Sequence, residues 1–261
     1  MTTLIPPDVI HVWQQSAIPV QHTHTLPPDT TTFYQLTSPA VIAQFIHHIQ
    51  QHGDGTQRTA ALVIVHYVVG TLTTLLIAPY AISGYFFDVT AQDIGIDYDP
   101  NGALTRVWIN PYRAIQTKQP LSVLAHKLQS LIMPIFTVIC RHAKLPVRGS
   151  QLVMYDALRR HTRLALQKAG IVDLQWIASL LEALGDTNKL PFPSFIVQPD
   201  AGPAVQWEQP RVCCVLAKTT DTHSCPHCPK HALAYRIDAT ETWLRTMSDI
   251  DFKIHTGRNR Q

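Results

Sequence analysis

Four cysteines in the last fifth of the chain are the residues best suited to chemistry. Cys213 and Cys214 are adjacent, ten residues follow, and Cys225 and Cys228 form a second pair with two residues between them. Four thiolates can complete the ligand shell of one tetrahedral metal ion, or bind the two iron atoms of a cluster with two ligands each. The pattern therefore predicts a metal centre.

The adjacent pair, Cys213 and Cys214, is informative about the kind of metal centre. Neighbouring residues of a strand direct their side chains to opposite faces. A zinc ribbon usually takes its ligands from two spaced pairs, because each turn needs room to direct both sulfurs inward. Adjacent cysteines therefore suit a target wider than one ion, such as a two-iron, two-sulfide rhomb, unless the backbone bends between them.

Other cysteine sites differ from this one in the residues that they require. A structural zinc ion remains an alternative, because His223, His227 and His231 lie beside the cysteines and could replace ligands. The tetrapeptide 225–228, Cys-Pro-His-Cys, also occurs as a redox active site, but there it follows an early strand of a βαβ core. A nucleobase deaminase would need His-x-Glu and then Pro-Cys-x-x-Cys, and neither is present.

Composition limits the class of protein. The chain has 261 residues, of which 46% are hydrophobic and 15% charged, and a formal net charge of +3. That charge is too small to predict a nucleic-acid surface. Four of the five cysteines fall within sixteen positions and Cys140 stands alone, which is unlike a disulfide framework and indicates a reducing compartment. The isolated Cys140 lies in an apolar run and is predicted to be a core thiol.

An uncharged stretch at 59–87 is long enough to cross a membrane. Polar residues on one helical face, together with Pro79 and Gly84, favour a buried core helix instead. The first basic residue is Arg58, so the basic start of a secretory signal is absent. We therefore expect a cytoplasmic protein, with peripheral contact at the inner face of the membrane left open.

Periodicity and turn residues predict the elements that must position the cysteines. An irregular arm is expected through residue 35, and five prolines between 190 and 210 predict a linker. A turn at 99–102 between two runs of alternating apolar residues predicts a β-hairpin. Residues 211–216 are predicted to form a strand. The predicted helices are 39–51, 58–77, one from 121 that Pro134 bends, 152–165, 174–184 and 240–250.

These features together carry a family resemblance. The cysteine spacing resembles that of the siderophore-iron reductase (FhuF-like) family. Further similarities are the helix start at 38–41, the uncharged helix containing Tyr67, Val69 and Gly70, Arg211 before the adjacent cysteines, and Pro229 after the last one. Two departures are the roughly thirty residues after Cys228 and Arg148 in place of an aromatic residue.

The resemblance implies a [2Fe–2S] cluster on Cys213, Cys214, Cys225 and Cys228 that reduces Fe(III) in an imported siderophore of the hydroxamate or carboxylate type. One added electron gives Fe(II), which hard oxygen ligands hold less well. Residues 52–55 lack the glycine pattern and the βαβ context of a dinucleotide site. An external donor of the ferredoxin, flavodoxin or flavin reductase type is therefore expected. An electron-transfer protein serving a partner enzyme and a zinc-stapled, non-catalytic binding protein are the alternative functions.

The predicted fold is mainly α with a small β component (α+β), with a helical bundle-like core, a β-hairpin and a C-terminal iron–sulfur module. Residues 1–190 are assigned to a mostly helical substrate-binding domain, and residues 191–261 to a Pro-rich linker and the [2Fe–2S]-binding module. The candidate substrate-binding residues lie on a semi-polar helix face and at basic positions that would pair with carboxylates: His66, Tyr67, Thr71, Arg148 and Arg159. A solvated helix face would carry the same arginines.

Overall fold

The computed structural model describes residues 5–14, 16, 18–52, 56–100, 102–111, 114–115, 119–169, 173–186, 194–197, 205–208 and 231–246. Over these residues the fold is mainly helical with a small β component, which confirms the predicted α+β class. The four cysteines of the predicted metal centre and the predicted strand 211–216 lie outside the described residues.

Helix α3 (Gln57–Leu72) is the centre of the fold. The side chain of Thr56 accepts a hydrogen bond from the Thr59 N–H and so caps its first turn. The helix continues through a π-helical turn, η2 (Thr73–Ile77), into α4 (Ala78–Ser83), which ends at Gly84 in the left-handed conformation. Most side chains of α3 are apolar, and they are buried on nearly every side of the helix, as predicted for this uncharged stretch.

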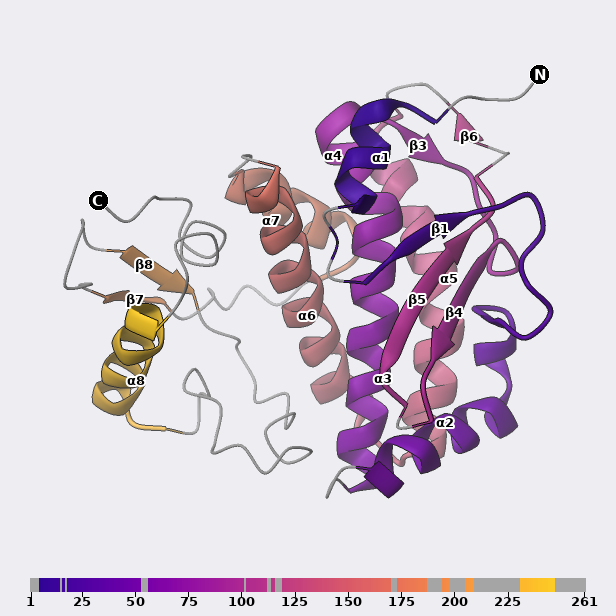
Figure 1. Cartoon of the computed structure of the whole chain (residues 1–261). Coiled ribbons are helices and arrows are strands. Elements are labelled where there is room, and N and C mark those ends of the chain that lie inside the picture. Colours follow the sequence, from indigo (N-terminus) through magenta and orange to yellow (C-terminus); the bar gives the residue numbers. More distant parts are fainter. Residues whose placement is uncertain are drawn as a thin grey trace.

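Three helices pack around α3, namely α2 (Pro39–His52), α5 (Leu121–His142) and α6 (Val147–Lys168). A fourth, α7 (Leu174–Ala183), rests on α5 and α6 (Figure 1). The Asp173 side chain caps α7 by accepting the Trp176 N–H at 2.8 Å. Each of these helices was predicted, and α5 continues well past Pro134 to its end.

Two helical stretches are long and apolar enough to cross a membrane by length and composition. They are Gln57–Ser83 and Leu121–His142, and 78% and 50% of their apolar windows are buried inside the protein. Burial on this scale explains the apolar character of the first stretch, because those side chains already contact protein.

The predicted hairpin is present as β4 (Ile94–Tyr98) and β5 (Leu104–Ile109), paired antiparallel. Two short strands extend it to a four-stranded sheet with the order β1-β5-β4-β2. β1 (Val20–His22) runs parallel to β5, and β2 (Thr31–Thr32) runs antiparallel to β4. The sheet lies over one side of the helices (Figure 1).

The irregular arm predicted through residue 35 is therefore wrong. This N-terminal segment contains the helix α1 (Pro7–Gln14) as well as β1 and β2, and the 3₁₀-helical turn η1 (Gln35–Thr37) follows β2. Val9 and Trp13 of α1 are four residues apart and both buried, and the Trp13 ring stacks on Phe87 at 5.5 Å. Strands of two or three residues gain their stability from pairing with β4 and β5, which local periodicity does not reveal.

The chain beyond α7 also differs from the prediction. The stretch predicted as a Pro-rich linker contains β7 (Ser194–Val197) and β8 (Val205–Glu208), which pair antiparallel. α8 (Leu233–Thr246) begins seven residues before the predicted start at 240. A further strand, β3 (Phe86–Phe87), follows the end of α4 and pairs antiparallel with β6 (Ala114–Ile115).

The hairpin turn packs against the end of α2. Gly102 has a φ of 76°, and its N–H donates to the Asp99 carbonyl at 2.9 Å. A Cβ atom on Gly102 would lie 2.8 Å from Ile49 Cγ1 of α2. The Tyr98 ring stacks on Phe45 of α2 at 4.4 Å, so the turn and the last strand residue both attach the sheet to the helices.

We predict that Gly102→Ala lowers the free energy of unfolding by about 1–3 kcal/mol, because the left-handed φ disfavours alanine and the added Cβ meets Ile49. Urea unfolding followed by far-UV circular dichroism measures the change. The matched control is Gly149→Ala in α6, where the nearest atom to the new Cβ is 3.8 Å away. Equal stability of the two variants would contradict the prediction.

Candidate functional site

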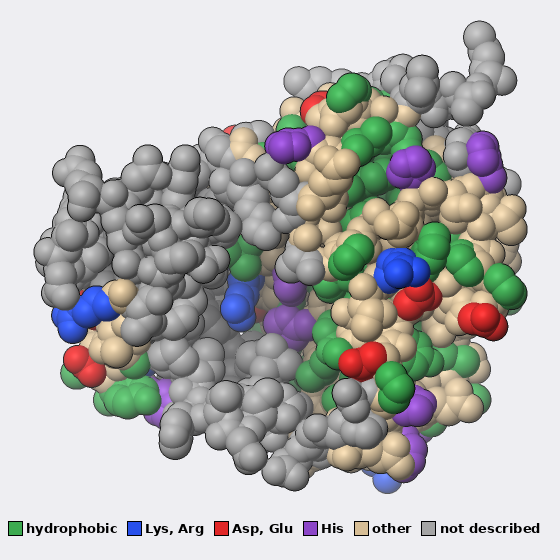
Figure 2. Space-filling view, in the orientation of Figure 1, with side chains coloured by type: hydrophobic (Ala, Val, Ile, Leu, Met, Phe, Trp, Pro, Cys, Tyr) green, Lys and Arg blue, Asp and Glu red, His purple; other side chains and the backbone are tan. Residues whose placement is uncertain are grey.

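Two histidines meet between the central helix and α6. The rings of His66 on α3 and His161 on α6 have centroids 5.8 Å apart and an interplanar angle of 67°. Both side chains are half-buried. Figure 2 shows histidine side chains beside a basic side chain on the flank of the helical body where α6 lies. We call His66 and His161 the histidine pair.

Gly70 makes room for this contact. It lies one turn after His66 on the same face of α3, and a Cβ there would be 3.4 Å from His161 Cε1. A glycine inside a helix costs about 1 kcal/mol relative to alanine. The close approach of the His161 ring gives that glycine a packing role.

The surroundings keep both imidazoles neutral. Burial, then His161, then the Arg160 guanidinium lower the pKa of His66 to about 3. Burial and then Arg160 lower the pKa of His161 to about 4. Removing a charged imidazole from water is unfavourable, and a nearby cation adds to that cost. At neutral pH each ring therefore has one N–H donor and one bare nitrogen acceptor.

Buried polar atoms without a hydrogen-bond partner gather at this interface. Such an atom costs about 1–3 kcal/mol when neither protein nor water satisfies it. In the part of the chain that the structure describes, α3, α6 and the π-helical turn contribute six of them: His66 Nε2, Thr71 Oγ1, Thr73 Oγ1, His161 Nε2, Thr162 Oγ1 and Arg163 Nε.

The other candidate residues of α3 have different surroundings. Tyr67 is half-buried, packs near Phe45 at 6.2 Å and hydrogen-bonds to the backbone of Leu104. Burial raises the pKa of its hydroxyl. Thr71 is buried in the core. Tyr67 thus faces α2 and the hairpin, whereas His66 faces α6, so the structure divides the predicted semi-polar face between two interfaces.

The two candidate arginines lie at different heights on α6. Arg148 is exposed in its first turn, and Arg159 is half-buried near its middle. Thirteen residues separate Arg148 from His161, which is about 20 Å along a helix axis. The structure therefore brings Arg159 and Arg160 to the level of the histidine pair and leaves Arg148 far from it.

Sequence reasoning named His66 but missed His161. Its helix was predicted, and Arg159 was named as a candidate, but the histidine two residues later was given no role. A signal was present in Gly70, since a glycine inside an apolar helix often marks the close approach of another group. Which group approaches depends on how α3 and α6 pack.

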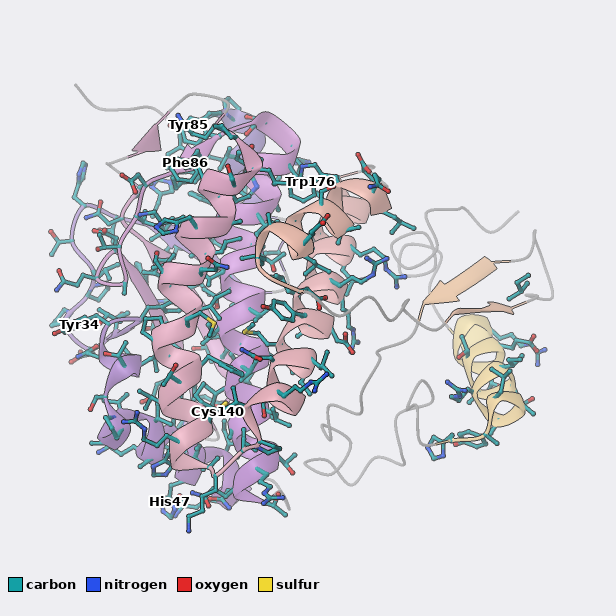
Figure 3. All side chains as sticks on the ribbon, turned by 180° about the vertical axis from the view of Figure 1, so that it is seen from behind. Tyr34, His47, Tyr85, Phe86, Cys140 and Trp176 are labelled. Carbon is teal, nitrogen blue, oxygen red and sulfur yellow. The ribbon has the colours of Figure 1, made fainter. Side chains whose placement is uncertain are left out.

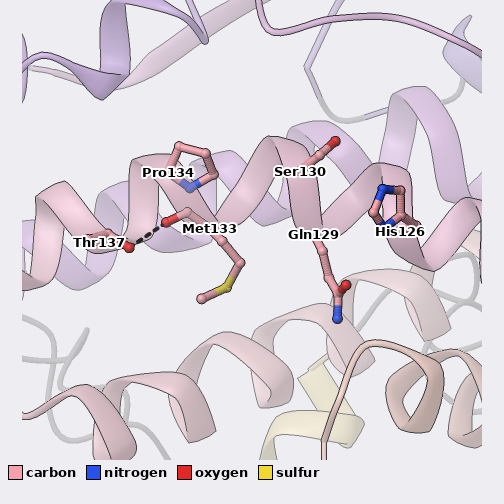
Figure 4. A pocket seen from close by; sticks show the side chains of 6 residues that line it. All are labelled: His126, Gln129, Ser130, Met133, Pro134 and Thr137. Atoms are coloured by element: carbon pink, nitrogen blue, oxygen red, sulfur yellow. Dashed lines mark hydrogen bonds between the residues drawn. The ribbon is translucent and has the colours of Figure 1, made fainter.

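A separate open groove runs along α5 (Figure 4). Its volume is about 530 Å³. Within it the Thr137 hydroxyl donates to the Met133 carbonyl at 2.8 Å, so that hydroxyl is satisfied by its own helix. Among the described residues, no predicted substrate residue and no Lys, Arg, Asp or Glu lines the groove; its lining is His126, Gln129, Ser130, Met133, Pro134 and Thr137.

Cys140 is free and buried inside the helical body, as predicted (Figure 3). Burial raises the pKa of its thiol. Among the described residues, no three His, Cys, Asp or Glu side chains come close enough to hold a metal ion. The predicted ligands all lie outside those residues.

The sequence matches no protein-family model, and no curated protein matches it.

We predict that the protein loses stability in mild acid through the histidine pair. Because both pKa values are lowered from 6.5 in the folded state, the unfolded chain binds more protons as pH falls below 6.5. When the pH falls from 7.5 to 5, protonation of each histidine in the unfolded chain should lower the free energy of unfolding by about 2 kcal/mol. Urea unfolding at the two pH values measures this.

His161→Gln should reduce that pH dependence by about half, since one titrating group is removed. His126→Gln, which changes an exposed histidine of α5, is the matched control and should retain the full dependence. An unchanged dependence in His161→Gln would rule out this account.

Proposed function

We propose that the protein reduces Fe(III) in ferric siderophores by one electron and releases Fe(II). The single observation that carries the proposal is the cysteine pattern, an adjacent pair followed after ten residues by a pair spaced by two. The resemblance to the siderophore-iron reductase family depends on the same spacing. Cys213, Cys214, Cys225 and Cys228 are the proposed ligands.

The donor set suits a [2Fe–2S] cluster, since four thiolates supply two ligands to each of two irons. Such a cluster, when bound, supplies one electron at a potential that hydrogen bonds and nearby charge adjust. The electron comes from an external donor of the ferredoxin, flavodoxin or flavin reductase type. The substrate iron gains it, and oxygen ligands hold the resulting Fe(II) less tightly.

The basic side chains of α6 support this proposal. α6 belongs to the same continuous core as α3, so its exposed side chains project from a fixed helix. The proposed task fits a protein of the cytoplasm, where imported ferric chelates and soluble electron donors meet. A carboxylate or hydroxamate chelate presents oxygen atoms, and the exposed guanidinium groups of Arg148 and Arg160 on α6 are suitable donors toward them.

We expect the purified protein to be brown and to absorb visible light as iron–sulfur proteins do. Cys213→Ser and Cys214→Ser should each remove most of that absorption, because a serine oxygen is a poor ligand for the soft iron–sulfide core. Cys140→Ala is the matched control, since it changes the one remaining cysteine, which is buried in the helical body. A colourless protein that contains one zinc ion per chain would instead establish the zinc-stapled alternative.

Reduction of the substrate is tested by stopped-flow spectroscopy under anaerobic conditions. The dithionite-reduced protein should be reoxidised by ferric citrate or by a ferric trihydroxamate, with one Fe(II) formed per electron and trapped by ferrozine. Reoxidation by a partner protein but by neither chelate would favour the electron-transfer alternative and contradict the proposal.

A further inference from the structure

Several helix ends meet at one end of the helical body. α5 ends and α6 begins there, and the Gln57 side chain in the first turn of α3 donates from Nε2 to the His142 carbonyl at 3.4 Å. Figure 3 shows His47, near the end of α2, at the same end. The turn between α5 and α6 leaves Pro146 and Val147 exposed, Val147 to 56%. Two adjacent apolar side chains thus lie in water at this end.

Positive charge surrounds the exposed apolar pair. Arg141, Lys144 and Arg148 lie on either side of it along the chain, and all three are exposed. Arg58 is exposed in the first turn of α3, which the hydrogen bond from α3 to the end of α5 brings to the same place.

Little negative charge opposes these cations. Residues 100–155 contain no Asp or Glu. In the part of the chain that the structure describes, no carboxylate forms an ion pair with any of the four cations. The hairpin turn that packs on the end of α2 contributes the carboxylate of Asp99, whose Oδ1 accepts the Ala103 N–H at 2.9 Å. The described cations at this end therefore outnumber that carboxylate.

Three of the cations stand where the local backbone disfavours them. Lys144 has a φ of 51°, and no other described residue except glycine has a positive φ. It follows α5 where glycine is usual, since the Leu145 N–H donates to the Cys140 carbonyl at 2.9 Å and closes the helix end. Arg58 and Arg148 lie at the positive ends of α3 and α6, and neither first turn contains an acidic residue. Such local costs indicate a role outside the fold itself.

An anionic lipid bilayer fits an apolar turn with cations around it. Apolar side chains enter the boundary between headgroups and acyl chains, while Lys and Arg remain among the lipid phosphates. Each cation near an anionic leaflet adds to the attraction. A protein partner would need a cavity shaped to the exposed turn, whereas lipid headgroups move aside for it.

We propose that this end of the helical body docks on an anionic lipid bilayer. The docking surface, which we call the basic tip, consists of Arg58, Arg141, Lys144, Pro146 and Val147. The two apolar side chains enter the interface and the three cations contact lipid phosphates. The basic tip goes beyond the reductase proposal and does not depend on it, since it names the surface that holds the protein at a membrane.

Vesicle flotation of the full-length protein tests the proposal. The wild type should float with vesicles of equal parts phosphatidylglycerol and phosphatidylcholine, and should not float with vesicles of phosphatidylcholine alone. Added salt should release the protein, because exposed charges are screened.

Lys144→Gly separates docking from folding, because glycine suits the left-handed φ and removes the charge. Its urea unfolding midpoint should equal or exceed that of the wild type, while its partition onto the mixed vesicles should fall about fivefold. Arg58→Gln should lose about as much partition. Val147→Ser should weaken partition by about threefold or more, since an exposed apolar side chain is lost.

The matched control is Lys127→Gln, which removes the same charge from α5 about 20 Å from Arg141 along the helix axis. It should float like the wild type. An equal loss in Lys127→Gln and Lys144→Gly would overturn the basic tip, because net charge would then explain the binding.

Unchanged partition of Lys144→Gly, or wild-type flotation with phosphatidylcholine alone, would also overturn the proposal. So would absence of flotation, and salt-sensitive capture of an acidic flavodoxin that Lys144→Gly loses would then assign the basic tip to a protein partner. Reoxidation by ferric chelates is measured without vesicles, so failure of the basic tip and failure of the reductase function are distinguishable.

Discussion

The burial of an uncharged helix on nearly all sides is the constraint on which the rest of this fold depends. Most residues of α3 are buried, so neighbouring elements must cover nearly all of its faces. Burying apolar surface stabilises by about 25 cal/mol per Å². That gain fixes α2, α5 and α6 around α3 and places the hairpin over α2. A polar side chain on α3 must therefore find its partner on one of these elements.

His66 shows the consequence of that constraint. Its position on α3 allows contact with α6, and Gly70 one turn later admits the His161 ring. Burial then keeps both rings neutral, and Arg160 reinforces the effect. A buried imidazole with a nearby cation differs chemically from an exposed histidine, because it stays neutral near pH 7 and does not change its charge there.

Much of the fold could be predicted from local signals. The hairpin strands follow alternation on both sides of a turn, and the long helices follow apolar spacing with caps such as the glycine after α7. The N-terminal segment could not be predicted in this way. Its strands of two and three residues form because they pair with the edges of β5 and β4. The residues of those edges lie more than sixty positions further along the chain. β7 and β8 were missed because prolines mark the same stretch as a linker.

The sequence by itself determined the cysteine pattern and the chemistry that it implies, because ligand type and spacing are properties of the chain. It also determined the α+β class and most helices, since hydrophobic periodicity is local. Only the tertiary structure decided which polar side chains share a site. It joined His66 to His161, turned Tyr67 toward the hairpin and left Arg148 apart. Such pairings depend on how helices cross, and packing of whole faces, more than any single residue, sets that geometry.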